Sequence, residues 1–176
     1  MSELLGTWYG KLLMLLALAA AAVLAMAALA QNRAEAQLAD LTQLMGNARQ
    51  AFGNSSDGYR NFVNGNLANL IAAGIIPAQM VRNGQLVDRW GDVVSIEPAW
   101  DTRNSMAGRI TFGGSESTED CVRVILGMKD FDALVVSALA FTADSPPAHD
   151  AYSAGLVTQY CGVSYPAGSM VTVTFS

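Results

Sequence analysis

Cys121 and Cys161 are the only cysteines, and their type and spacing support one specific chemistry. A metal site needs several clustered thiolate, imidazole or carboxylate ligands, and the chain offers only one histidine to assist two thiols that are far apart. A disulfide is the better interpretation, and it implies an oxidising compartment such as the periplasm or the cell exterior. Closing a loop of about 40 residues constrains the unfolded chain by roughly 4 kcal/mol in the loop-entropy description.

The remaining reactive side chains form no recognisable catalytic or metal-binding pattern. His149 follows Pro146-Pro147-Ala148 in a turn-like stretch, which is typical of a solvated loop histidine rather than a general base. No Gly-x-Ser-x-Gly nucleophile turn occurs, and the acidic residues between positions 101 and 132 lack the spacing of a calcium loop. We therefore predict that the protein is not an enzyme and has no cofactor or metal site.

The charge balance is acidic, with 10 Lys+Arg against 15 Asp+Glu and no basic block. Nucleic acid is excluded as an expected partner, because phosphate binding needs clustered Lys and Arg side chains.

The N-terminal third of the chain predicts one long helix, residues 1–52. Leu12 to Ala30 carries no charged side chain, and its 19 positions give roughly 28 Å of helix, close to the thickness of a bilayer core. Residues 31–52 are amphipathic, and their apolar stripe has steps of three and four residues at Ala34, Leu38, Leu41, Met45, Ala48 and Phe52. The first part suits lipid or a filament core, and the second part suits packing on a globular domain.

This segment has three interpretations. Ala28-Leu29-Ala30 matches a signal-peptide cleavage site, but the apolar run exceeds a typical signal core and the helical stripe continues past it. A signal anchor with Lys11 on the cytoplasmic side is the second interpretation. The third is a helix that resides in the membrane and later becomes buried in an assembly. Hydropathy alone does not separate the last two.

Residues 53–176 are within the size range of one globular domain. Residues 59–73 are compatible with a helix, and Ser117 predicts the N-cap of another helix over 118–128. We predict strands over 93–98, 109–112, 133–141, 156–161 and 170–175, and turns at Asn83-Gly84 and Trp90-Gly91. Trp90 and Trp100 are expected to pack within the domain. This order of elements is typical of an α+β fold.

The chain resembles the type IVb pilins, the subunits of bundle-forming, toxin-coregulated and plasmid-encoded thin pili. The resemblance covers nearly the whole chain and depends on the order of its elements rather than on any single one. Its components are the apolar helix running into Leu29–Ala34, the helical region ending at Leu67–Gly74, the Trp90-Gly91 turn, Gly113-Gly114 before the cysteine helix, the second cysteine in Thr158–Gly162 and the closing strand Met170–Phe175.

The resemblance implies a lollipop-shaped α+β fold, in which an antiparallel sheet packs on the C-terminal half of the long helix and the apolar half protrudes. Residues 121–161 are then the disulfide-bounded region that is usually exposed in the fibre. The implied function is that of a structural subunit, the major pilin of a type IVb-like pilus, which polymerises through its N-terminal helix into an extracellular filament. The implied partners are identical subunits, the inner membrane before assembly and the pilus assembly machinery, and the implied roles are conjugative mating or adhesion.

One departure from the family concerns the N-terminus. Pilins of this family usually carry a glutamate at the fifth mature position, after a glycine where the leader is cut. With Met1 as the first residue, the nearest acid is Glu3; with a cut after Gly6, Thr7 is first and Lys11 takes the place of the glutamate. We expect Met1 to be mature or near-mature.

The assembly surface implied by the resemblance is Met1, Glu3, Lys11, Leu12, Leu16, Val23 and Ala27. Charges beside an apolar core are costly when unpaired, so Glu3 and Lys11 would each pair with an opposite charge of a neighbour, or else lie in solvent or lipid headgroups. Small side chains such as Ala19–Ala22 let helices pack closely. The alternatives are a minor pilin or pseudopilin, or an anchored or secreted binding domain that does not polymerise.

Overall fold

The structure is a computed structural model. It describes residues 2–101, 104–137, 139–142, 154–162 and 170–176, and only the backbone of residues 2–12, 20–32, 139, 141 and 142.

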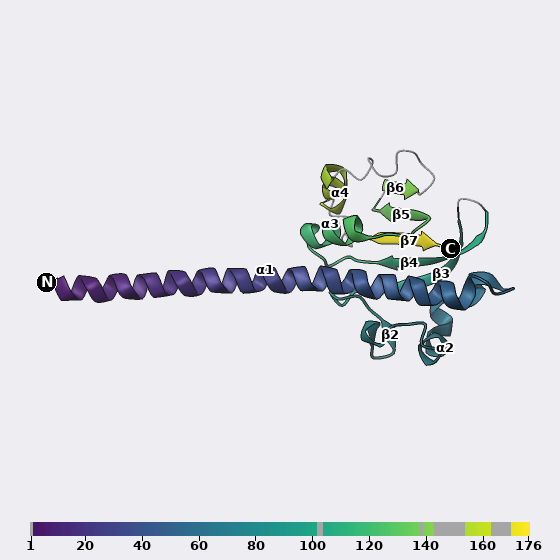
Figure 1. The fold of residues 1–176 in the computed structure, drawn as a ribbon, viewed down its shortest axis with the longest axis horizontal. Coiled ribbons are helices and arrows are strands. Elements are labelled where there is room, and N and C mark those ends of the chain that lie inside the picture. The colour runs from purple at the N-terminus through teal and green to yellow at the C-terminus, as the bar shows by residue number, and fades with distance from the viewer. Residues whose placement is uncertain (1, 102–103, 138, 143–153, 163–169) are drawn as a thin grey trace.

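One helix, α1 (Ser2–Phe52), runs 51 residues, and its N-terminal half protrudes from a globular head (Figure 1). The predicted long helix is confirmed and continues through Gly46, where nothing lies within 4 Å of a Cβ position. Within the head, α1 buries one face, which is made by Ala34, Gln37, Leu41, Leu44, Met45 and Ala48. Leu38 and Phe52 pack at the edge of this core, so the amphipathic stripe predicts the packed face correctly.

The head contains a five-stranded antiparallel sheet that lies beside the C-terminal half of α1 (Figure 1). Its strands are β3 (Ser95–Trp100), β4 (Met106–Phe112), β5 (Ala133–Val136), β6 (Leu139–Thr142) and β7 (Val171–Phe175). They are ordered β3-β4-β7-β5-β6, so the last strand of the chain lies in the middle. The predicted α+β fold, with a protruding helix and an antiparallel sheet, is confirmed.

The register of the sheet separates its two faces. Ile110, Val173 and Leu134 lie side by side on β4, β7 and β5, and all three are fully buried toward the core. The neighbouring row, Thr111, Thr172 and Val135, points to the opposite face and is partly exposed. Strand side chains alternate between faces, so one side of the sheet forms the core and the other faces outward.

Shorter elements lie on both sides of α1. The segment η1 (Gly58–Asn61), η2 (Asn64–Asn66), α2 (Leu67–Ala72), η3 (Ala78–Met80), β1 (Val81–Arg82) and β2 (Gln85–Leu86) follows α1 in the chain. In Figure 1, α2 and β2 lie across α1 from the sheet. Helices α3 (Thr118–Gly127) and α4 (Ala154–Cys161) lie on the sheet side, near the protruding half of α1.

The strand predicted over 156–161 is wrong, because these residues form helix α4. Val157 and Cys161 are both buried and are four residues apart, which places them on one helical face. That face packs on α3, and this tertiary contact overrides the local preference of a short apolar run.

Three other predictions are also wrong in part. The single strand predicted over 133–141 is the hairpin β5–β6, because Ser137 adopts a left-handed φ of 54° and reverses the chain. The helix predicted over 59–73 is divided into η1, η2 and α2, with Asn and Gly residues at the break. Trp100 was expected to pack inside the domain, but its side chain is 62% exposed at the end of β3.

Candidate functional site

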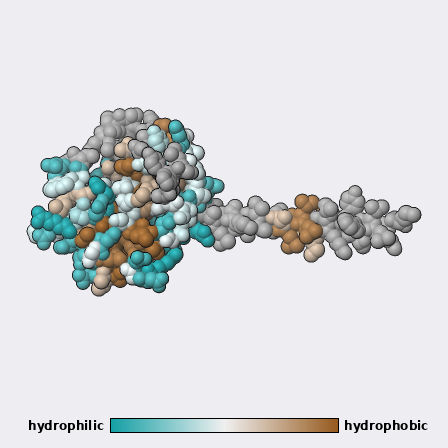
Figure 2. Space-filling model, turned by 180° about the vertical axis from the view of Figure 1, so that it is seen from behind, coloured by the Kyte–Doolittle hydropathy of each residue, from teal (hydrophilic) through white to brown (hydrophobic). Residues whose placement is uncertain are grey.

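The protruding half of α1 carries an apolar surface without a neighbour in the isolated chain. Where its side chains are described, over residues 13–19, Leu13, Met14, Leu15, Leu16 and Leu18 are each 59–67% exposed. Figure 2 shows them as a hydrophobic band on the rod, well away from the head. Large apolar side chains at this exposure favour burial in another phase or against another molecule.

The predicted assembly residues all belong to this rod except Met1, which lies outside the described residues. The side chain of Leu16 is 59% exposed. For Glu3, Lys11, Leu12, Val23 and Ala27, only the helical backbone is described. The same holds for Gly6 and Thr7, where α1 continues without a break. Within the described part of the chain, no helix combines the length and the hydropathy needed to cross a membrane.

The packed half of α1 is tied to the segment across from the sheet by a buried ion pair. Asp40 is 3% exposed, and Arg89 donates to it through Nε at 2.5 Å and Nη2 at 2.9 Å. The hydrogen bonds to Asp40 raise the pKa of Arg89. Gln79 also donates to Asp40, and the backbone N–H of Arg89 donates to Gln37 Oε1 at 2.9 Å. These polar contacts set the position of the 78–89 segment along the rod.

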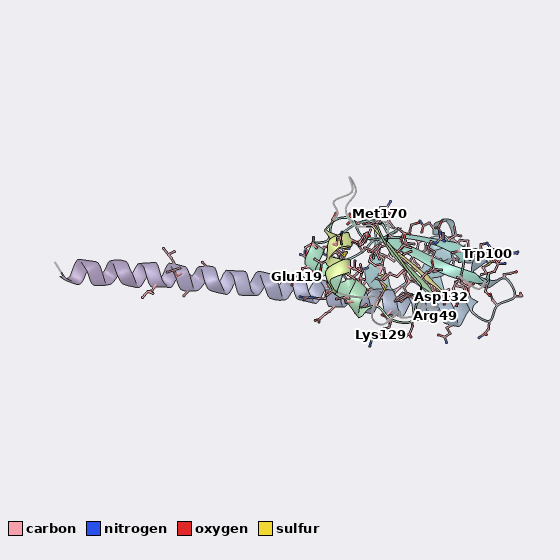
Figure 3. The ribbon with its side chains drawn as sticks, turned by 90° about the horizontal axis from the view of Figure 1, so that it is seen from above. Arg49, Trp100, Glu119, Lys129, Asp132 and Met170 are labelled. Atoms are coloured by element: carbon pink, nitrogen blue, oxygen red, sulfur yellow. A yellow bond between two sulfur atoms is a disulfide. The ribbon has the colours of Figure 1, made fainter. Side chains whose placement is uncertain are left out.

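A second contact joins α1 to the end of the chain. Arg49 Nε donates to the backbone oxygen of Ser176 at 2.7 Å, and Arg49 Nη2 donates to the backbone oxygen of Asp130. The guanidinium also lies 5.4 Å from the centre of the Phe175 ring, a cation–π distance. Figure 3 labels Arg49 within the head. One side chain of α1 therefore holds the C-terminus of the central strand.

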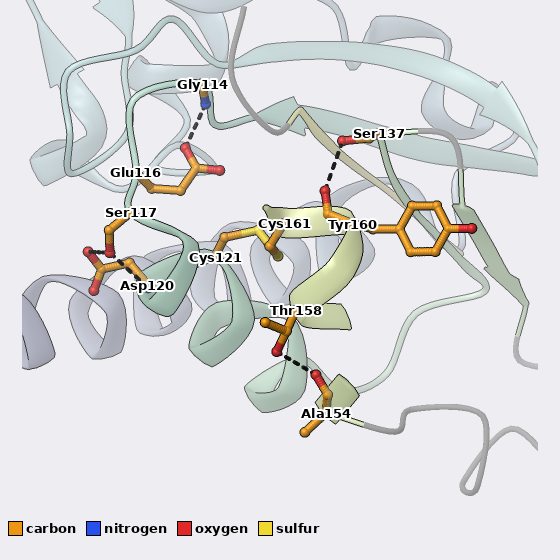
Figure 4. The surroundings of a disulfide bond; sticks show 10 residues. All are labelled: Gly114, Glu116, Ser117, Asp120, Cys121, Ser137, Ala154, Thr158, Tyr160 and Cys161. Atoms are coloured by element: carbon orange, nitrogen blue, oxygen red, sulfur yellow. Dashed lines mark hydrogen bonds between the residues drawn. A yellow bond between two sulfur atoms is a disulfide. The ribbon is translucent and has the colours of Figure 1, made fainter. Parts of the chain in front are cut away.

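Cys121 and Cys161 form the expected disulfide, with their Cα atoms 5.9 Å apart. It joins α3 to α4, and both sulfur-bearing residues are buried (Figure 4). The predicted N-cap of α3 is confirmed, since Ser117 Oγ accepts from the N–H of Asp120 at 3.1 Å and donates to its carboxylate at 2.8 Å. Ser137 Oγ donates to the backbone oxygen of Tyr160, so α4 is also bonded to the β5–β6 turn.

Three carboxylates lie where the Trp90-Gly91 turn meets the loop between β4 and α3. Asp88 is 2% exposed, and its Oδ1 accepts from the N–H groups of Trp90, Gly91 and Asp92 at 2.8–2.9 Å. Asp92 accepts from Ser115 N–H and Oγ, and Glu116 accepts from Gly114 N–H at 2.6 Å. Burial raises the pKa of both Asp88 and Glu116, and the neighbouring carboxylates add to the effect.

This carboxylate cluster was missed in the sequence, although the Trp90-Gly91 turn was recognised. The available signal was Asp88, which lies two residues before the Trp90-Gly91 turn. Asp side chains often accept hydrogen bonds from the backbone N–H groups of the residues that follow them. Within the described ranges, no three His, Cys, Asp or Glu side chains are arranged to hold a metal ion. His149 lies outside those ranges. The hydrogen bonds of Asp92 to Ser115 make this cluster a junction between the two loops.

Comparison with protein families matches residues 31–150 to the family described as PilS N terminal. The matched range covers the packed half of α1, the segment across from the sheet, and the sheet through β6. A search of curated proteins gave no match.

Two solved structures have the same fold. A type IVb pilin from Salmonella typhi aligns with a TM-score of 0.63 and 15% identity, over 81% of this chain and 99% of that one. TcpA, a type IV pilin from the Vibrio cholerae El Tor biotype, aligns with a TM-score of 0.58 and 11% identity, over 82% of this chain and 99% of that one. At these identities the likeness is one of fold.

Proposed function

The chain belongs to the PilS N-terminal family and has the fold of type IVb pilins, and we propose that it is the major subunit of a type IVb-like pilus. The observation that carries this proposal is the exposed apolar surface over residues 13–18, which projects from a head whose own core is complete. A soluble binding domain has no need of such a rod. A filament subunit needs it, because identical rods can bury one another.

Polymerisation exchanges lipid for protein around the protruding half of α1. Before assembly the subunit resides in the inner membrane through residues 12–30, and the assembly machinery then extracts it into the fibre. If each subunit buries roughly 1,000 Å² of apolar helix surface, burial contributes about 25 kcal/mol before ordering costs. Head-to-tail contacts that do not close on themselves produce an open helical filament.

The N-terminal charges fit the same proposal. Glu3 and Lys11 pair with opposite charges of neighbouring subunits and set the axial register, in the absence of a glutamate at position five. The extracellular fibre then mediates contact between cells, either for conjugative mating or for adhesion. The more general assignment, that the chain is a pilin subunit of a pilus, follows from the family and the fold.

The test replaces one exposed apolar residue of the rod. Leu16 is 59% exposed, so Leu16→Glu leaves the head folded but places a charge in the proposed filament core. We expect sheared fibres to fall at least tenfold, with the cellular amount of subunit unchanged. Leu16→Ile is the matched control and should assemble normally. Normal fibres from Leu16→Glu cells would contradict polymerisation through this surface.

The composition of the fibres separates the alternatives. A major pilin dominates the sheared high-mass fraction, whereas a minor pilin or pseudopilin is a trace component and a non-polymerising domain is absent from it. The intact mass of the fibre subunit should be two hydrogens lower than that of the reduced chain, because of the disulfide. The same spectrum reports whether the mature subunit begins at Met1 or Thr7.

A further inference from the structure

The tight turn between β1 and β2 contains one of the two Asn-Gly pairs in the chain, Asn83-Gly84. The register pairs Arg82 with Gln85, so only these two residues form the turn. Asn83 has a φ of 52° and Gly84 has a φ of 76°. A two-residue hairpin turn of this kind requires positive φ at both positions, which Asn and Gly adopt at the lowest cost. The fold therefore favours this dipeptide at the turn.

An Asn-Gly pair can undergo a covalent change without an enzyme. The backbone nitrogen of the glycine attacks Cγ of the asparagine, so that an N–Cγ bond forms while the Cγ–Nδ2 bond breaks. The proton of the glycine N–H leaves with the amide group as ammonia, and a five-membered cyclic imide remains. One water molecule then opens the imide at either carbonyl, which restores the N–H and gives aspartate or isoaspartate. Glycine permits this attack because it has no Cβ to obstruct it.

The surroundings of Asn83-Gly84 permit this reaction. Both residues are exposed, and no atom beyond the chain neighbours lies within 4 Å of the position that a Cβ of Gly84 would take. The imide ring and the attacking water therefore have room. Strands β1 and β2 form a separate two-stranded sheet with two residues in each strand. Such a short hairpin opens locally at low cost, which lets the nitrogen of Gly84 turn toward Cγ of Asn83.

The other Asn-Gly pair, Asn64-Gly65, is held by the sheet. Asn64 Oδ1 accepts from the N–H of Ile96 at 2.9 Å, and Asn64 Nδ2 donates to Ser95 Oγ at 3.3 Å. These bonds fix the amide group of Asn64 on β3, and Cγ can turn toward the nitrogen of Gly65 only after they break. Within the described residues, the amide of Asn83 has no corresponding hydrogen bond. The tertiary structure therefore distinguishes two pairs that the sequence presents as alike.

We propose that Asn83 is a site of spontaneous deamidation, which gives the chain a second, more acidic form. Both products add one negative charge to a chain whose net charge is −5. Aspartate keeps the turn, because Asp-Gly also favours it. Isoaspartate adds one atom to the backbone of the turn and disturbs the pairing of Val81 with Leu86. Since Leu86 is 2% exposed, the isoaspartate form is the less stable of the two products.

The test compares the two Asn-Gly pairs within one molecule. The full chain is kept in detergent micelles in mildly alkaline buffer and is digested at intervals with pepsin at acidic pH, where cyclisation is slow. Mass spectrometry measures the conversion of the amide NH2 to OH at each asparagine, and electron-transfer fragmentation distinguishes isoaspartate from aspartate. We expect Asn83 to react at least tenfold faster than Asn64. Equal rates at the two sites, or an unmodified Asn83, overturn the proposal.

Two controls connect the difference in rate to the structure. Urea removes the hydrogen bonds of Asn64, so the rates at the two sites should become similar. A difference that persists in urea would show that the flanking sequence sets the rates, and it would contradict the structural argument.

Asn83→Gly is the matched variant, because Gly-Gly also favours this turn and has no amide side chain. Ion-exchange chromatography should show that the acidic form of this variant accumulates several-fold more slowly than that of the parent chain. An unchanged rate of accumulation would contradict the assignment to Asn83.

Discussion

At the scale of single residues, Asp88 is a buried carboxylate whose oxygen accepts the hydrogen bonds of a tight turn. Three successive N–H groups converge on its Oδ1, which closes the Trp90-Gly91 turn, while burial raises its pKa. Asp92 and Glu116 are the charged groups that act on it from the same junction. The turn therefore gains three hydrogen bonds at the cost of holding a negative charge in a dry site.

The raised pKa of Asp88 has a definite consequence for stability. Between its ordinary pKa of 3.8 and its higher folded-state value, the folded chain binds more protons than the unfolded chain. The free energy of unfolding therefore rises as pH falls through this window, and that contribution is lost as pH rises through the folded-state pKa. Glu116 acts with the same sign. Asp88→Asn with Glu116→Gln should flatten this slope in urea titrations from pH 4 to 7.

Two uncharged variants of Asp88 serve as controls: one keeps an acceptor oxygen at this position and the other removes it. Asp88→Asn retains an oxygen for the three N–H groups, so at neutral pH its stability should stay close to that of the parent. Asp88→Ala leaves those donors unpaired and should lose about 1–3 kcal/mol. An equal loss in both variants would show that charge, rather than acceptor geometry, matters at this turn.

At the scale of elements, the contact between β4 and β7 requires a glycine at position 108, because a side chain there would collide with its neighbours. A Cβ at Gly108 would lie 2.7 Å from the ring of Phe175 and 3.0 Å from that of Tyr59. Both rings belong to an aromatic cluster with Phe52 and Phe62, whose ring centres are 5.6–6.2 Å apart. The rings have little room to move, because each is packed by the others.

Gly108→Ala should therefore destabilise the head by about 1–3 kcal/mol through overpacking. The matched control is Gly46→Ala, in the interior of α1 with open space around it, which should stabilise by about 0.5–1 kcal/mol. Chemical denaturation of both variants measures the difference. A neutral Gly108→Ala would mean that the aromatic cluster repacks more easily than its geometry indicates.

At the scale of the whole molecule, the last strand completes the fold. β7 pairs with β4 on one side and β5 on the other, so the two halves of the sheet join only through residues 171–175. Val171, Val173 and Phe175 are 0–1% exposed. The head is therefore one cooperative unit that closes only when the C-terminus is present.

Ending the chain before Met170 should abolish cooperative folding, even though both cysteines remain. The three lost core side chains contribute about 1.5–3 kcal/mol each, against a typical total stability of 5–15 kcal/mol. Removing only Ser176 is the control, since it retains β7 and alters only one end contact of Arg49. Thermal melts followed by near-ultraviolet circular dichroism compare the two chains. A sharp transition in the longer truncation would contradict the closing role of β7.

Features with a strong local signature could be predicted from the sequence. The long helix, its buried stripe, the Ser117 cap and the disulfide are set by periodicity, a side-chain hydroxyl at a helix start and the presence of only two cysteines. The order of these elements was also enough to indicate the pilin fold. The exposed rod surface around Leu16 was likewise readable, because an uninterrupted apolar helix needs no tertiary information to be recognised.

The tertiary structure decided the features that depend on residues distant in the chain. Helix α4 packs Val157 and Cys161 on α3, and β5 pairs with β6 on one side and with the distant strand β7 on the other. The carboxylate junction combines side chains from two loops that are distant in the sequence. Local preference cannot report such pairings, since their free energy arises only when distant segments pack together.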